Sequence, residues 1–133
     1  MKNIIDIIDN NTFLKKIFPD GLSDIKIGRM NFYFENKIEI FIYTNQEPAF
    51  SPDKWGKWGI DYTTVVLFIS GHFSKNIQVH NWQSNSLDNC SIEISENGTV
   101  YSIHITGNNW DILLELENFI FQSCSTYIDE ALI

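Results

Sequence analysis

The chain has 133 residues, 44% of them hydrophobic, and this length predicts a single domain, residues 1–133, that needs no disulfide or metal to fold. With 21 Ile, ten Phe and only two Ala, the composition favours β-strands over helices. The formal net charge of −8 arises in residues 76–133, which contain eight acids and no Lys or Arg, and this disfavours a nucleic acid or an anionic membrane as a partner.

The N-terminal segment has a helical pattern. Apolar residues recur at helical spacing at Ile4, Ile5, Ile8, Phe13, Leu14 and Ile17. The pattern weakens at Asn10 and Asn11, where an Asn can cap a second short helix. We expect the helix to end at Phe18, because the residue before a proline is pushed out of the α region.

Two strands joined by a short turn are expected next. The alternation of residues 25–27 resumes out of phase at Met30, which predicts a strand with a β-bulge at Gly28. Residues 35–37 then turn the chain into a second strand over 38–42, where isoleucines alternate with other residues.

The middle of the chain alternates between loops and strands. Two prolines and two glycine-flanked tryptophans predict a loop over 45–61. The nearly continuous apolar run 63–70 is typical of a central strand covered on both faces. We expect residues 71–72 to turn the chain into a further strand over 73–79, and 84–89 to form a polar loop.

A hairpin is predicted around Asn97-Gly98, the preferred central pair of a type I′ turn, in which both positions need a positive φ. This turn pairs apolar residues with apolar ones and polar residues with polar ones: Ile94 with Tyr101, Ile92 with Ile103, Cys90 with Ile105, and Glu93 with Ser102. Turn chemistry and periodicity therefore agree.

The final segment, 111–128, fits either a helix or strands. Ile112, Leu116 and Ile120 have helical spacing, but 114–116 and 119–121 also alternate as two strands. We expect strands, because the residues after them are poor helix formers. The whole pattern predicts a mostly β (α+β) fold, in which a short N-terminal helix precedes a largely antiparallel, twisted sheet or sandwich of about seven or eight strands.

No catalytic or cofactor motif is present in the sequence. It contains no glycine-rich phosphate loop, no HExxH and no GxSxG, so we expect a protein that is not an enzyme and binds no cofactor. Three histidines at positions 72, 80 and 104 have no spacing that requires a metal. Cys90 and Cys124 match no disulfide or zinc pattern and are expected to be buried free thiols.

A secretory signal or a membrane span is not expected from the sequence. Asp6 and Asp9 interrupt the apolar residues near the N-terminus, unlike the apolar region of a signal peptide. The longest apolar run, 65–69, is far shorter than the ~20 residues of a transmembrane helix. The expected compartment is therefore the cytoplasm.

The order of hydrophobic and aromatic landmarks resembles the immunity protein 50 family of bacterial polymorphic toxin systems. The resemblance covers most of the chain and rests on Phe13-Leu14, Ile17-Phe18-Pro19, Pro52-Asp53-Lys54-Trp55, Val79-His80-Asn81-Trp82, and an Ile/Phe alternation that closes on Tyr127. It implies a cytoplasmic protein that binds a toxin domain and blocks it. It implies no catalytic residues.

A toxin such as a nuclease has a basic groove, so the acids of residues 76–133 are candidate contacts. Their alternative role is only to keep the fold soluble. The partner-binding candidates are Glu93, Asp111, Glu115 and Glu117, together with Trp55 and Trp58, although packing is expected for at least one of these tryptophans. The alternative function is a β-barrel or sandwich that binds a small ligand in an aromatic-lined cavity. The sequence leaves the oligomeric state open.

Overall fold

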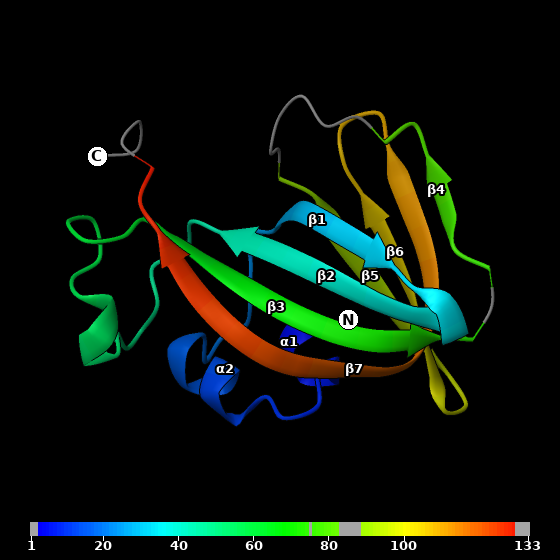
Figure 1. Cartoon of the computed structure of the whole chain (residues 1–133), viewed down its shortest axis with the longest axis horizontal. Helices are drawn as coiled ribbons and strands as arrows, with labels where there is room; N and C mark the ends of the chain where they lie inside the picture. Colours follow the sequence, from blue (N-terminus) through cyan, green and yellow to red (C-terminus); the bar gives the residue numbers. More distant parts are fainter. Residues whose placement is uncertain (1–2, 75, 83–88, 130–133) are drawn as a thin grey trace.

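The computed structural model in Figure 1 describes residues 3–74, 76–82 and 89–129. Their seven strands form one antiparallel, curled sheet with the order β1-β2-β3-β7-β6-β5, and β4 also pairs with β7. The strands are β1 (Lys26–Phe32), β2 (Lys37–Thr44), β3 (Thr64–Phe73), β4 (Gln78–His80), β5 (Ser91–Asn97), β6 (Val100–Thr106) and β7 (Asp111–Tyr127). The predicted fold class is confirmed.

The N-terminal segment forms two short helices, α1 (Ile4–Ile7) and α2 (Thr12–Ile17). Asn10 has a positive φ of 62° at the break between them. Asn11 precedes α2, but its side-chain amide donates to the carbonyl of Ile5 at 2.9 Å and does not cap the helix. Both helices pack against the inner face of the sheet, behind β3 and β7 in Figure 1. None of the helices in the described part of the chain has the length and apolar character needed to cross a membrane.

The first two strands follow the predicted pattern. The pairing of β1 with β2 shifts between Ile27 and Arg29, which confirms the bulge at Gly28. The ring of Tyr43 lies so close to Gly28 that a side chain there would overlap it. The inward-facing isoleucines of β2 are buried, and the chain turns through the short 3₁₀ segment η1 (Phe34–Asn36).

The central strand β3 lies between β2 and β7, and it is longer than the sequence pattern predicts. The predicted turn at residues 71–72 is wrong, because β3 continues through them. Gly71 lies directly against the carbonyl oxygen of Asn118 in β7, where no Cβ would fit. Glycine at position 71 therefore allows β3 and β7 to approach each other closely. The next strand, β4, has three residues only, and most of the predicted loop at 84–89 lies outside the described residues.

Residues 111–127 form one strand of 17 residues, where the sequence pattern predicts two strands. Its pairing with β3 shifts at Glu117 and again at Gln122, so each of these residues is the extra residue of a β-bulge. Each bulge moves the buried positions by one residue. Leu116 and Phe119, three residues apart, consequently both face the core. This explains why the apolar residues of the segment have a helical spacing.

The curvature of β7 divides the sheet into two halves (Figure 1). The first half contains β1, β2, β3 and residues 118–127 of β7; the second half contains β4, β5, β6 and residues 111–116 of β7. The two free ends of the sheet meet where the backbone N–H of Cys90 donates to the carbonyl of Ile25 at 2.8 Å. The core fills the interior between the halves and α1 and α2.

The β5–β6 hairpin has a different register from the predicted one. Ile94 lies opposite Ile103, and Glu93 lies opposite His104. The turn falls on Gly98-Thr99, and Gly98 has a φ of +67°, as a type II′ turn requires at its first central position. The shift of two residues leaves every side chain on its predicted face, since sheet faces alternate with a period of two.

Candidate functional site: the acidic outer face of the second half

Four residues form a row across the second half of the sheet. Glu93 of β5 lies opposite His104 of β6, His104 opposite Leu113 of β7, and Leu113 opposite Gln78 of β4. Directly opposite residues in antiparallel strands share a face. Their neighbours along β6 and β7 are buried in the core, so this row lies on the outer side. We call the outer side chains of the second half the acidic outer face.

Asp111, at the start of β7, joins three strands of this face. One carboxylate oxygen lies 3.1 Å from Nδ1 of His80 in β4, and the other lies 3.0 Å from Nε2 of His104 in β6. The hydrogen bond from His104, with smaller contributions from His80, lowers the pKa of Asp111 below its ordinary value. The arrangement holds β4 and β6 to β7. Among the described residues, no group of three or more His, Cys, Asp or Glu side chains is placed to hold a metal ion.

The other two acidic candidates occupy different positions on β7. Glu115 lies opposite Ser102, one pair further along the outer face, and accepts a hydrogen bond from Oγ of Ser74 at 3.5 Å. Glu117 is the exposed extra residue of the bulge, just beyond the last β6–β7 pair. The structure therefore brings Glu93, Asp111 and Glu115 onto one face and places Glu117 at its end.

Two shallow depressions shape the acidic outer face. One, of about 340 Å³, is lined by Glu93, His104 and neighbouring residues. The other, of about 260 Å³, is lined by Gln78, Glu115 and neighbouring residues. Both include Ser102 and Leu113, so they adjoin. Side chains of a protein partner fit such open, adjoining depressions better than a small ligand, which needs an enclosing pocket.

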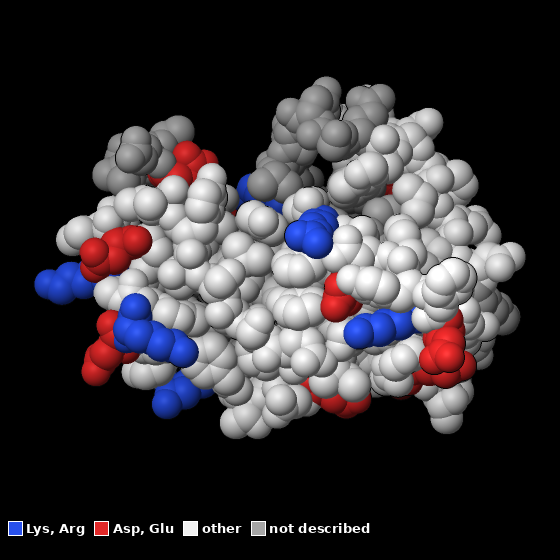
Figure 2. Space-filling view, viewed as in Figure 1, with Lys and Arg blue, Asp and Glu red and all other residues white. Residues whose placement is uncertain are grey.

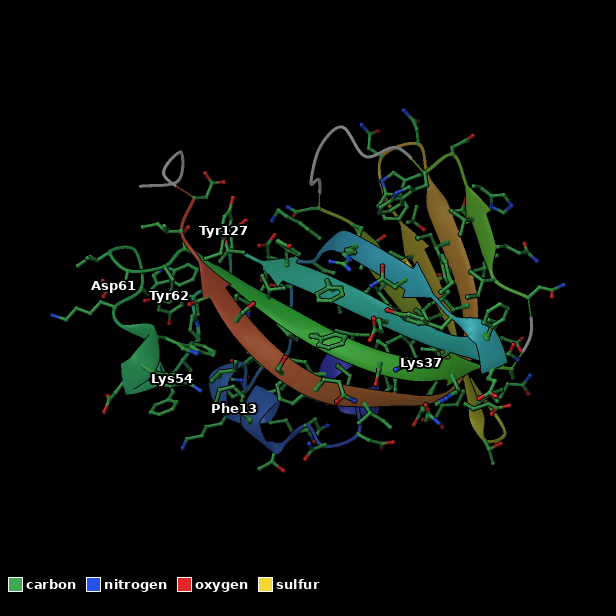
Figure 3. All side chains as sticks on the ribbon, viewed as in Figure 1. Phe13, Lys37, Lys54, Asp61, Tyr62 and Tyr127 are labelled. Carbon is green, nitrogen blue, oxygen red and sulfur yellow. The ribbon has the colours of Figure 1, made fainter. Side chains whose placement is uncertain are left out.

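The two loop tryptophans belong to an aromatic cluster at the far end of the first half. Trp55 is only 8% exposed and makes edge-to-face contacts with Phe13 at 5.8 Å and Tyr62 at 5.7 Å between ring centroids. Trp58 is half-buried, with its ring 5.2 Å from that of Tyr62. Figure 3 shows Tyr62 and Asp61 in this loop, at the end of the sheet where β7 reaches Tyr127. Trp55 is thus a core residue, as expected for at least one of the pair.

The outer face of the first half carries an aromatic stack that sequence reasoning missed. Phe41 and Phe68 lie opposite each other on β2 and β3, stacked with 4.7 Å between ring centroids, and the guanidinium of Arg29 lies 5.1 Å from the Phe41 ring. Figure 2 shows this face, on which acidic and basic side chains are interspersed among neutral ones. The signal available in the sequence was a phenylalanine at an outward position in each of the two strands.

The two cysteines are free thiols, as predicted, and both are half-buried. Sγ of Cys90 donates to the carbonyl of Ile25 at 3.4 Å, and Cys124 faces Leu67 of β3. Burial raises the pKa of Cys90 to about 11 and that of Cys124 to about 12. Neither thiol therefore has the low pKa of a catalytic nucleophile.

Comparison with known proteins gives no relative that could assign this face a role. No protein-family model matches the chain. Neither a curated protein nor a solved structure matches it.

Proposed function

We propose that the chain is an immunity protein that binds a cognate bacterial toxin domain and blocks it without catalysis. The observation that carries the proposal is the acidic outer face, on which Glu93, Asp111 and Glu115 lie together in a segment, 76–133, without Lys or Arg. A basic toxin, such as a nuclease with a positively charged groove, complements this face.

The role requires little else of the molecule. An inhibitor of this kind needs a rigid surface of the correct charge and no active site. It must also be present where the toxin is made, so we place it in the cytoplasm of the producing cell. Long-range attraction to a basic partner speeds association, and salt weakens that attraction.

The test is a reversal of charge on the proposed face. Replacing Glu93, Glu115 and Glu117 together with Lys should abolish protection of cells that express the toxin domain encoded directly upstream. Glu93 and Glu117 are exposed and Glu115 is half-buried, with a hydrogen bond from Ser74, so the variant should still fold with a small loss of stability. A desolvated charge pair at the centre of an interface costs about 2–5 kcal/mol when one partner is removed, whereas a pair at the rim mainly changes the association rate.

A matched control makes the same change of net charge elsewhere. Asp20, Glu47 and Asp53 are exposed residues outside the second half, and their joint replacement by Lys should leave protection intact. Equal protection by both folded triple variants would refute the proposed face. Failure of the chain to bind the toxin domain encoded directly upstream would refute the proposed function.

The small-ligand alternative gains no support from the described residues. The depressions on the acidic outer face are open, and the inward-facing aliphatic side chains of β2, β3 and β7 are buried against one another.

A further inference from the structure

The short strand β4 lies at an edge of the sheet. It pairs with β7 on one side, through Gln78, Val79 and His80. On the other side, β2 pairs with β3 only as far as Lys37 opposite His72, and among the described residues no strand other than β7 pairs with β4. All three residues of β4 are exposed. An exposed edge presents backbone N–H and C=O groups that an additional strand can pair with.

An apolar depression of about 600 Å³ lies beside this edge. It is lined chiefly by Phe32, Phe73, Ile77 and Val79, and we call it the β4 pocket. Phe32 is 52% exposed and Val79 44%. At the adjacent β1–β2 turn Phe34 is 97% exposed, and Figure 1 shows this turn and β4 at the same end of the molecule. Large apolar side chains gathered in this way at the surface are typical of an interaction site.

The two sides of β4 differ in chemistry. Val79 lies opposite the buried Ile112, so its side faces the β4 pocket. Gln78 and His80 lie opposite Leu113 and Asp111, so their side continues the acidic outer face, and Gln78 also borders the β4 pocket. A strand added to this edge would alternate in the same way. It would present apolar side chains to the β4 pocket and basic side chains to the acidic outer face.

We propose that an extended, basic segment of the toxin docks on the free edge of β4 as an additional strand, with an apolar side chain in the β4 pocket. This inference rests on the proposed function and names the mode of binding. Main-chain hydrogen bonds and side-chain pockets share the recognition in this mode. Because β4 has only three residues, the apolar anchor contributes much of the affinity.

The negative charge of the chain favours a basic toxin segment over a second copy of the chain as the occupant of this edge. Two copies would bring a formal charge of −8 each to an edge that already has Asp111 one strand away. A large net charge of one sign on each copy disfavours their association. A basic segment removes this repulsion, whereas self-association increases it.

A direct test uses synthetic peptides and backbone-amide NMR of the whole chain. The probe is Lys-Val-Lys-Phe-Lys-Val-Lys, which has one apolar and one basic side when extended. It should shift the amide resonances of residues 78–80 and those around Phe32. Two peptides control for charge and for pairing. The first is Glu-Val-Glu-Phe-Glu-Val-Glu; the second is the probe with an N-methylated Phe, which keeps the ring but removes a backbone N–H donor. Equal shifts with either control, or none at β4 with the probe, would overturn the proposal.

Variants of the chain locate the site independently of the peptides. Phe32→Ser and Val79→Ser, which remove apolar side chains of the β4 pocket without changing the charge, should each weaken binding of the basic peptide and of the toxin domain about tenfold or more. Ile60→Ser is the matched control, because Ile60 is a 68% exposed apolar residue in the distant loop. Toxin binding that survives both β4-side variants would refute this docking mode and leave the proposed function standing. A concentration-dependent dimer that Phe32→Ser abolishes would identify a second copy as the occupant.

Discussion

The two halves of the sheet differ in the partners of the charged side chains on their outer surfaces. In the first half, charged side chains have partners within the same face. Glu39 accepts hydrogen bonds from Tyr33 at 2.6 Å and from Asn31 at 3.3 Å, and the bond from Tyr33 lowers the pKa of Glu39. Lys37 lies 5.4 Å from the ring of Tyr33, close enough for a cation–π contact.

The second half has its acids in a segment, 76–133, that contains no Lys or Arg. Asp111 is hydrogen-bonded to the imidazoles of His80 and His104, and Glu93 lies exposed opposite His104. The difference teaches that one continuous sheet can combine a self-neutralised face with a face suited to a basic partner. The variants below test how residues of each half contribute to the stability of the fold.

The largest loss of stability is expected from the aromatic cluster of the first half. Trp55→Ala removes a buried ring that contacts Phe13 and Tyr62, and such a truncation costs about 3–5 kcal/mol of unfolding free energy. Trp58→Ala should cost clearly less, because Trp58 is half-buried. Urea unfolding of both variants measures the difference. Equal losses of unfolding free energy would show that Trp55 contributes no more to the core than Trp58.

A smaller loss of stability is expected from a substitution at the boundary between the two halves. Gly71→Ala places a methyl group against the carbonyl oxygen of Asn118, next to the bulge at Glu117, and overpacking of this kind costs about 1–3 kcal/mol. Gly28→Ala is the matched comparison, because the group it would meet is the Tyr43 ring, a side chain that can rotate away. Thermal unfolding should rank Gly71→Ala as the more harmful change. The reverse ranking would contradict a tightly packed β3–β7 contact.

The second half should respond to acid through Asp111. Its pKa is lowered in the folded state, so its hydrogen bonds stabilise the fold above the ordinary carboxyl pKa of about 4. This stabilisation is lost as the pH falls through the lowered pKa. Asp111→Asn should therefore remove part of the acid sensitivity of unfolding, as measured by denaturant titrations at stepwise lower pH. An unchanged pH profile would show that the two histidine contacts add nothing to stability.

The smallest effect concerns the thiols. Because burial raises both cysteine pKa values, a thiol reagent at mildly alkaline pH should label the native chain slowly and the urea-unfolded chain rapidly. A reducing agent should leave the unfolding midpoint unchanged, since both cysteines are free. Rapid labelling of native Cys90 would contradict its contact with Ile25.

Sequence alone predicted which side of β2 and of the β5–β6 hairpin faces the core. Ile38, Ile40 and Ile42 are buried as their alternation indicates, and the phase slip at Gly28 is a bulge. Alternation reports burial directly, because successive side chains of a strand point to opposite faces. The same reasoning placed Glu93 on the outer face, although its predicted partner across the hairpin was wrong.

Only the tertiary structure decided which strands and residues lie opposite one another. A shift of two residues changes every partner and no face, so the pattern could not distinguish a turn at Gly98-Thr99 from one at Asn97-Gly98. The two bulges of β7 are set by its pairing with β3, which lies far away in sequence. The burial of Trp55 depends likewise on a helix and a loop that meet only in the folded chain. Local periodicity therefore determines the faces of the regular strands, and long-range pairing determines their register and the bulges that change the buried side of β7.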